Sequence, residues 1–450
     1  MPISTTSAGP AAPPRLAKVL GLGGAVVFGL AYMMPMASFT TYGVVNTLTE
    51  GHIVTSYIVT LVAMLFTAAA YAAMSRAFPV TGAAYSYTRR TFGGHLGFLG
   101  GWTIMLDYVL LPMMAYLVIG VYLHEAVPAV AQPVWIAVSI AVVTVLNSLG
   151  IKLLSRLNSA IVVAQTVFLV VFAVLAARLI AGAEVPSLGD ALYGQGPGTA
   201  AIFAGSAILC YSFLGFDAIS SLAEETRDAR RTIPRAIMLV TLLGGLIFIA
   251  ISLVSNLAYP DWRSYTNPDA AALDVVFAVG GGLLEAFFTA AFVAGCFGAV
   301  MSQQATVSRL LFSMGRDGVL PRRIFGVLHP RFKTPVRATL VVAAIGLVSL
   351  FVDLAFASSL INFGALTAFS LVNVAVIKHY IIDERRRGAY AMVRYLLVPL
   401  VGLGLSLWLW TSLSGQALVV GLVWVVLGVA YLAVLTRGFR NAPPELAIEE

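Results

Sequence analysis

Two carboxylates stand inside long apolar stretches of this chain. Asp217 follows Gly215 by two residues in CYSFLGFDAISS, and Asp107 lies in MLDYVLLP. A charged side chain at the centre of a bilayer costs about 2.5–3.5 kcal/mol on insertion scales, so such a residue is by default a candidate for function. No Lys or Arg lies centrally in an apolar stretch. The two acids therefore favour a ligand that brings positive charge and no carboxylate.

The composition is that of a membrane protein. The 450 residues are 60% hydrophobic and 10% charged, whereas a soluble domain carries about 25% charged residues. Apolar runs of about 20 residues, long enough to cross a bilayer as helices, recur along the chain. We predict an all-α polytopic protein with twelve spans, near 19–45, 53–75, 96–123, 129–150, 157–177, 197–223, 236–259, 275–308, 338–355, 356–377, 395–413 and 416–436.

Loop charge predicts the orientation in the membrane. Of the 27 Lys and Arg residues, all but Arg178 and Arg263 fall on the side of the N-terminus under this assignment. Basic loops stay in the cytoplasm, so both termini are predicted to be cytoplasmic. The net charge of +7 follows from this topology, and it gives no reason to expect a nucleic-acid partner.

Motifs for catalysis or metal binding are absent from the sequence. Cys210 and Cys296 both lie in predicted spans, so neither a disulfide framework nor a metal site is expected. The sequence contains no Walker loop, no His-Glu-x-x-His and no serine elbow. We therefore expect no catalytic residues, no cofactor and no enzymatic activity.

Two predicted spans carry helix-weakening residues at matching places. Span 1 has Pro35 near its middle, and span 6 has Ser212 and Gly215 beside Asp217. Non-helical backbone at this depth is tolerated only where it lines a cavity in the protein. Interrupted spans in corresponding positions of two halves indicate the substrate site of a transporter. The alternative for Asp217 is a structural role, as the cap of the broken half-helix.

Four longer segments carry a family likeness. They are YSFLGFDAISSLAEETRDARRTIPRAI, RAFPVTGAAYSYTRRTFGGHLGFLGGWTIMLDYVLLP, SRLLFSMGRDGVLPRRIFGVLHPRFKTP and INFGALTAFSLVNVAVI. They resemble segments of the amino acid–polyamine–organocation transporters and, within that superfamily, of the bacterial putrescine importers. The resemblance runs from about residue 18 to residue 440.

The resemblance implies a fold, a location and a mode of action. The fold is of the leucine-transporter type, with two inverted repeats of five helices, two extra C-terminal helices and alternating access. The location is the bacterial cytoplasmic (inner) membrane. The implied division is a disordered cytoplasmic tail at 1–17, repeats at 18–182 and 191–380, a helix pair at 390–437 and a cytoplasmic tail at 438–450.

The substrate class follows from departures within this likeness. Amino-acid carriers of the superfamily hold the substrate carboxylate on free amides of a glycine-rich turn in span 1. Here the turn reads Pro35-Met36-Ala37; Pro35 has no amide hydrogen, and Met36 crowds the approach. Span 5 has neutral Gln165 near the place where some amino-acid members carry a lysine. We expect a diamine importer, with a neutral or basic amino-acid permease as the alternative.

Ammonium groups of a diamine could pair with the acids and lie against aromatic rings. The predicted substrate-binding residues are Asp217, Asp107, Tyr211, Ser212, Phe213, Gly215, Phe216, Tyr32, Met36 and Ala37, with Tyr108 and Trp102 as further ring faces. Asp217 and then Asp107 are the candidates for carrying a coupled proton. The alternatives are a packing role for Asp107 and a core role for the aromatic residues.

A burst of charge follows span 6. Glu224, Glu225 and Arg231 are predicted to form ion pairs that close a cytoplasmic gate, and the alternative is a solvated basic loop. The expected partners are a small cationic substrate, a proton and the lipid bilayer. The choice of diamine, proton or sodium coupling, import or exchange, and the oligomeric state stay open.

Overall fold

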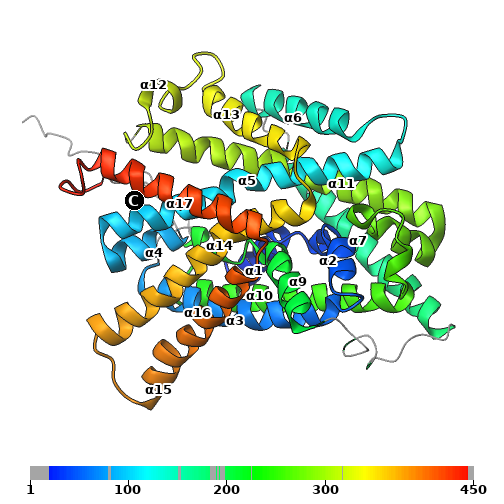
Figure 1. Cartoon of the computed structure of the whole chain (residues 1–450), viewed down its shortest axis with the longest axis horizontal. Coiled ribbons are helices and arrows are strands. Elements are labelled where there is room, and N and C mark those ends of the chain that lie inside the picture. Colours follow the sequence, from blue (N-terminus) through cyan, green and yellow to red (C-terminus); the bar gives the residue numbers. More distant parts are fainter. Residues whose placement is uncertain are drawn as a thin grey trace, which may run out of the picture.

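The computed structural model describes residues 20–79, 83–149, 154–182, 189, 192, 198–223, 226–316 and 318–443. The elements of this part of the chain are helices (Figure 1). Eleven of them are long and apolar enough to cross a bilayer. The all-α polytopic architecture is therefore confirmed. The predicted tail 1–17, the gate residues Glu224 and Glu225 and most of the C-terminal tail lie outside the described residues.

Apart from the two predicted to be interrupted, the spans begin and end close to their predicted positions, and one of them, α11, has a kink at Gly281, where φ is +66°. They are α3 (Ile53–Ala77), α5 (Gly94–Ala126), α6 (Gln132–Leu149), α7 (Leu154–Ala181), α10 (Ala229–Ala258), α11 (Ala272–Arg316), α14 (Leu354–Ile377), α16 (Val398–Thr411) and α17 (Gly415–Leu435). Shorter helices connect them: α4 (Ala83–Phe92), α12 (Arg322–Phe325) and α15 (Ala389–Met392). At the ninth predicted position, α13 (Val336–Gly346) and η5 (Leu347–Leu350) form an apolar helix that is too short to count as a span.

Both predicted interruptions are present. The first span divides into α1 (Leu22–Tyr32), the 3-10 turn η1 (Pro35–Phe39) and α2 (Tyr42–Leu48). The sixth divides into α9 (Thr199–Phe213) and the 3-10 turn η2 (Asp217–Leu222). These breaks leave backbone polar groups without their usual helical partners, and such groups must be satisfied inside the protein.

The two interruptions lie against each other. Gly215 has φ +123°, and a Cβ atom at this position would lie 2.5 Å from Cδ1 of Tyr32 at the end of α1. Gly29 on α1 lies equally close to η2 and α10, since a Cβ there would be 2.7 Å from Ile219 Cδ1 and from Val240 Cγ2. Small residues at these contacts let the backbones approach, as is usual between helices in membranes.

The elements form an enclosed centre and a lipid-facing periphery. α5 is the most enclosed of the described spans. In α5, 89% of an apolar stretch of 18 residues is buried inside the protein, and in α17 the same share is 17%. The apolar side chains that α17 and α7 leave exposed are those expected of helices that face lipid. Figure 1 shows α17, in red, running from the left edge of the view toward its middle, and the helix packs on α5 and α14.

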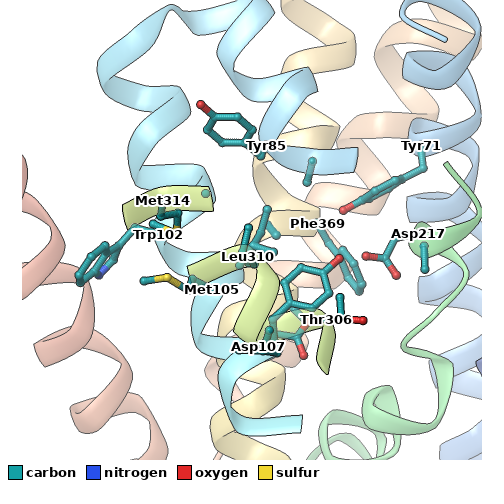
Figure 2. Close-up of a pocket in the computed structure, with 18 of the residues that line it drawn as sticks. Tyr71, Tyr85, Trp102, Met105, Asp107, Asp217, Thr306, Leu310, Met314 and Phe369 are labelled. Atoms are coloured by element: carbon teal, nitrogen blue, oxygen red, sulfur yellow. The ribbon is translucent and has the colours of Figure 1, made fainter. Parts of the chain in front are cut away.

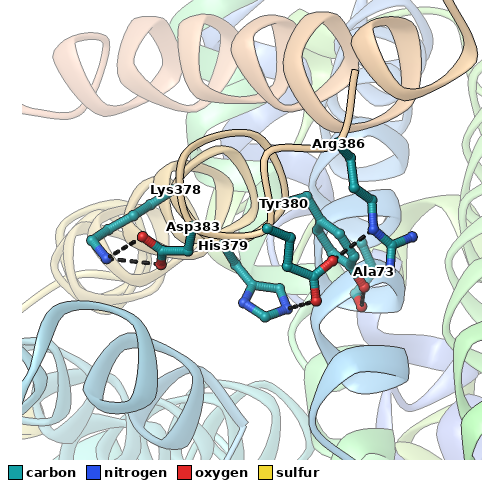
Figure 3. Close-up of polar contacts among 7 residues, drawn as sticks. Ala73, Lys378, His379, Tyr380, Asp383 and Arg386 are labelled. Atoms are coloured by element: carbon teal, nitrogen blue, oxygen red, sulfur yellow. Dashed lines mark hydrogen bonds and ion pairs between the residues drawn. The ribbon is translucent and has the colours of Figure 1, made fainter. Parts of the chain in front are cut away.

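A polar cluster ties the end of α14 to α3 (Figure 3). The last turn of this span continues as the π-helix η6 (Lys378–Asp383). Tyr380 Oη donates a hydrogen bond to the Ala73 carbonyl at 3.0 Å, and the Arg386 guanidinium lies 4.9 Å from the centre of the Tyr380 ring. Arg386 Nε also contacts Glu384 at 2.6 Å. These contacts join the C-terminal end of α3 to the end of α14.

Candidate functional site

A cavity of about 400 Å³ lies between the broken spans and the centre of the bundle. Its walls come from α1, α3, α4, α5, η2, α11 and α14. The residues that line it are Phe28, Tyr32, Tyr71, Ala84, Tyr85, Phe98, Gly101, Trp102, Ile104, Met105, Asp107, Tyr108, Asp217, Ala218, Thr306, Val307, Leu310, Met314, Ala365, Ala368 and Phe369. None of these described lining residues is Lys, Arg or His, so their formal charge is negative.

Asp107 and Asp217 both face this cavity (Figure 2). Asp107 is 7% exposed, and its Oδ1 has no hydrogen-bond partner within the described part of the chain. Oδ1 of Asp217 accepts a hydrogen bond from the Gly215 amide at 3.2 Å. The Tyr71 hydroxyl points toward Asp217 in Figure 2. A buried carboxylate oxygen without a partner is costly, and a ligand that donates hydrogen bonds would remove that cost.

Glycines bring the elements that carry these acids together. A Cβ at Gly364 of α14 would lie 2.8 Å from the Thr103 carbonyl and 3.1 Å from the Asp107 amide. The close approach of α14 and α5 beside Asp107 therefore requires a residue without a side chain. At Gly215 the positive φ, a conformation that L side chains rarely adopt, lets the chain turn so that η2 begins at Asp217.

The far end of the cavity is aromatic and rich in sulfur. Figure 2 shows Trp102 beside Met105 and Met314, well separated from Asp217. Phe98, one helical turn before Trp102, stacks on it at a centroid distance of 6.1 Å. The cavity thus combines an acidic end, suited to a cation, with an apolar end that suits a hydrocarbon chain.

Three predicted substrate-binding residues share the cavity: Asp107, Asp217 and Tyr32. Tyr108 and Trp102, predicted as ring faces, line it as well.

Two other predicted residues, Tyr211 and Ala37, line a second cavity of about 60 Å³. Tyr32 belongs to both linings and stands between the two spaces.

The remaining predicted residues lie outside both linings. Phe213 is fully buried and packs edge-on against Phe248, with ring centroids 5.5 Å apart. Ser212 shares a hydrogen bond of 3.2 Å with Tyr57. Phe216 packs behind the cavity against two of its lining rings, Tyr71 at 5.5 Å and Phe369 at 5.2 Å. Gly215 turns the chain, and Met36 is fully buried in η1.

Several lining residues were not singled out from the sequence. Tyr71 of α3, Tyr85 of α4, Thr306 of α11 and Phe369 of α14 all contribute to the wall. Tyr71, Thr306 and Phe369 stand in ordinary membrane-span composition, and Tyr85 stands in a short polar helix between two predicted spans. Their contribution depends on which helix face points inward, and nothing in the spacing distinguishes that face.

The predicted gate residue Arg231 lies at the start of α10. It forms an ion pair of 3.7 Å with Asp228, and both side chains are largely exposed. A hollow of about 420 Å³ on this side is lined by Arg76, Arg230, Arg231 and Arg235. Because Glu224 and Glu225 lie outside the described residues, the gate stays a prediction.

An aromatic cluster closes the opposite side of the molecule. Phe39 of η1 contacts Phe172 at 5.6 Å and Phe288 at 5.2 Å between ring centroids. Phe288 belongs to α11 but lies nearer its Ala272 end than the lining residue Thr306 does. Beyond the cluster, Asn46 of α2 donates a hydrogen bond to Tyr265 Oη at 2.7 Å. The cavity walls reach instead toward α4 and the start of α5.

Comparison with known proteins gives a consistent family. The family model described as "Amino acid permease" matches residues 19–438. The chain is 38% identical to the low-affinity putrescine importer PlaP of Escherichia coli (strain K12) over 453 residues, which covers 96% of each chain. It is 28% identical to the methylthioribose transporter of Bacillus subtilis (strain 168), covering 92% of each chain. Identity to the branched-chain amino acid permease BcaP of the same organism is 26%, covering 85% of each chain.

Proposed function

Because the chain belongs to the amino acid permease family of transporters, we propose that it imports putrescine-like diamines by alternating access, coupled to protons. It is a multi-pass membrane protein and not an enzyme.

The observation that carries the proposal is the pairing of two carboxylates with no cationic residue in one aromatic cavity. Asp107 and Asp217 bring negative charge, and none of the described lining residues neutralises it. An ammonium group would form charge-assisted hydrogen bonds with Asp107 and Asp217, about twice as strong as neutral ones. The rings around them could stabilise it further. The 38% identity to a putrescine importer supports the same class.

The driving force follows from the charge of the substrate. A membrane potential of 100 mV favours inward movement of a single positive charge by about 2.3 kcal/mol. A proton could travel with the substrate, and Asp217 is the first candidate to carry it, with Asp107 the second. A single carboxylate cannot pair with an ammonium group while it is protonated. Binding of the substrate would therefore weaken binding of the proton at that carboxylate, and the reverse.

The proposed topology has twelve spans, with α13 and η5 as the ninth. The repeats 18–182 and 191–380 would each begin with an interrupted span, whose first helical part is α1 in one repeat and α9 in the other. The helix pair 390–437 would follow. Both termini would lie in the cytoplasm of a bacterium, and the protein in its inner membrane. In this orientation the cavity reaches toward the cytoplasm, which corresponds to an inward-facing state.

Transport of an amino acid is the second candidate, favoured by the similarity to a branched-chain amino acid permease. It would need free amides in η1 for the substrate carboxylate. Pro35 has no amide hydrogen, and the Ala37 amide already donates to the Met34 carbonyl at 2.7 Å. These two features disfavour a carboxylate at this turn.

Uptake into proteoliposomes tests the proposal. Labelled putrescine would be offered with an imposed proton gradient, with unlabelled diamines and amino acids as separate competitors. We expect uptake that diamines inhibit and amino acids do not, and that falls when the proton gradient is collapsed at constant membrane potential. Inhibition by amino acids without putrescine uptake would instead establish the second candidate.

A further inference from the structure

We propose that α17 determines which substrates fit the cavity, although it contributes no side chain to the described lining. Trp424 and Gly428 of α17 hold Trp102 in the cavity wall, and the fixed position of that ring limits the length of the bound chain. The inference rests on the proposed function, because it concerns chain-like cations that bind in this cavity. Trp424 and Gly428 would be positioning residues that act through Trp102.

Two reciprocal hydrogen bonds fix the indole rings of Trp102 and Trp424. Trp102 Nε1 donates to the Trp424 carbonyl at 2.9 Å, and Trp424 Nε1 donates to the Trp102 carbonyl at 2.9 Å. The rings stack with centroids 4.7 Å apart and planes 19° apart. Each indole has a single N–H donor, so neither ring can rotate without leaving that donor unpaired in an apolar environment.

Gly428 brings the α17 backbone against the same ring. A Cβ atom at Gly428 would lie 2.4 Å from Cδ1 and 2.6 Å from Nε1 of Trp102. Tyr431, on the next turn, lies 5.6 Å from the Trp102 ring and donates its hydroxyl to the Val319 carbonyl. The indole is therefore supported by α17 and has no room to retreat from the cavity.

Because Trp102 lies in the cavity wall, its fixed position affects which substrates the cavity can hold. Asp107 and Asp217 occupy one part of the cavity, and Trp102 stands apart from Asp217 in Figure 2. A diamine held through one ammonium at the acids would extend its hydrocarbon chain past Met105 and bring its second ammonium to the face of this ring. A closely packed wall accepts an extra methylene poorly, and a pocket can discriminate one methylene by about 10-fold or more. The ring held by α17 would thus select chain length.

A matched pair of glycine substitutions tests the inference. Gly428→Ala would press a methyl group on Trp102 and move the ring toward the cavity. Gly421→Ala, on the same helix, would press a methyl group on Phe363, whose Cδ2 would lie 2.4 Å away. Phe363 is buried and does not line the cavity. Both variants overpack an aromatic ring to a similar degree, and only Gly428→Ala does so at the cavity wall.

The readout is the ratio of kcat/KM for a five-carbon diamine to that for a four-carbon diamine in proteoliposomes. We expect Gly428→Ala to lower this ratio at least about 3-fold, since the longer chain meets the displaced ring first. Gly421→Ala should leave the ratio within about 2-fold of wild type, even if both rates fall. An unchanged ratio in Gly428→Ala, or an equal shift in both variants, would overturn the inference.

A double-mutant cycle tests whether Trp424 acts through Trp102. Trp424→Phe removes one N–H donor and should shift the ratio in favour of the longer diamine, because Trp102 is then less firmly held. Added to Trp102→Phe, it should have little further effect, since residues acting as a unit are not additive. Trp410→Phe is the control: Trp410 donates to Thr367 at 3.1 Å and lies outside the cavity lining. Fully additive shifts would contradict the inference.

These outcomes separate the inference from the proposed function. If wild type takes up no diamine, the proposed function fails, and the same ratio is measured with a longer and a shorter substrate that wild type does transport. The inference then stands if Gly428→Ala shifts that ratio and fails if it does not. Should Gly428→Ala not accumulate in the membrane, the cycle of Trp424→Phe with Trp102→Phe decides.

Discussion

The two acids of the cavity are held in different ways. Asp217 belongs to the turn that it begins, since its carboxylate accepts the Gly215 amide. Asp107 lies on an unbroken helix, and its Oδ1 has no partner within the described part of the chain. An unpaired buried charge destabilises a fold. We therefore expect Asp107 to bind a ligand and not to serve packing alone.

Removal of either charge should weaken diamine binding and uptake while the fold survives. In Asp217→Asn the side-chain oxygen can still accept the Gly215 amide, and in Asp107→Asn no described hydrogen bond of Oδ1 is lost. A hydrogen bond to a charged group contributes about 1.5–3 kcal/mol, so we expect affinity for putrescine to fall roughly 10- to 150-fold. Binding to purified protein and the melting temperature in detergent would be measured together.

The control for this pair is Asp383→Asn. Asp383 pairs with Lys378 at 2.9 Å in an exposed position outside the cavity, so this variant should bind putrescine like wild type. For Asp107→Asn the melting temperature should not fall, because a desolvated charge has been removed. A lower melting temperature with full binding would assign Asp107 to packing.

Part of this site could be predicted residue by residue from the sequence. An acid in an apolar run is conspicuous because its cost in lipid is high, which is why Asp107 and Asp217 could be selected without a structure. Tyr71 and Thr306 carry no such cost, and their place in the wall depends on helix rotation. The partners of Trp102 were equally hidden, since Trp424 is distant in sequence and indole rings are common in membrane helices.

At the scale of elements, the contact between the two broken spans depends on one glycine. Gly215→Ala would place a methyl group 2.5 Å from the Tyr32 ring at φ +123°. Backbone held in such a region costs about 1–3 kcal/mol, so we expect a lower melting temperature. Because Tyr32 lines the cavity, we also expect a raised KM for putrescine.

Gly404→Ala is the matched control for this substitution. Gly404 lies on α16, and a Cβ atom there would meet nothing within 4 Å. Alanine is the better helix former by about 1 kcal/mol, so its stability should be unchanged or raised and its KM unaffected. Equal melting temperatures for Gly215→Ala and wild type would show that the turn does not need the positive φ.

Helix positions could be predicted more completely than helix faces. Length and hydropathy placed the long spans, because each must cover the same bilayer thickness. The ninth predicted span is shorter in the structure than in the prediction. Asp353 accepts a hydrogen bond of 2.7 Å from the Phe356 amide and so caps the start of α14, the next helix. The direction of Phe216 could not be predicted, because a break in a helix resets the direction of every side chain after it. Phe213 ends α9, and its direction depends on the rotation of that helix.

At the scale of the whole molecule, the two sides of the cavity are built differently. Side chains of α4 and of the first turns of α5 line its wall on one side. On the other side, Phe39, Phe172 and Phe288 pack ring against ring. Alternating access requires one closed and one accessible side at a time. In the proposed orientation the side carrying α4 is also the side of the basic loops and faces the cytoplasm.

A cysteine at Thr306 should therefore react with a membrane-impermeant thiol reagent from the cytoplasmic side. Thr306 lines the cavity, and the native residues Cys210 and Cys296 are 0% and 4% exposed, so background labelling should be low. In inside-out vesicles we expect rapid labelling of Thr306→Cys that putrescine slows, since the bound diamine would occupy the same space.

Phe288→Cys, buried in the aromatic cluster, should react slowly from this side and serves as the control. Faster labelling of Thr306→Cys in right-side-out vesicles would reverse the proposed orientation, because the cavity would then face the outside of the cell.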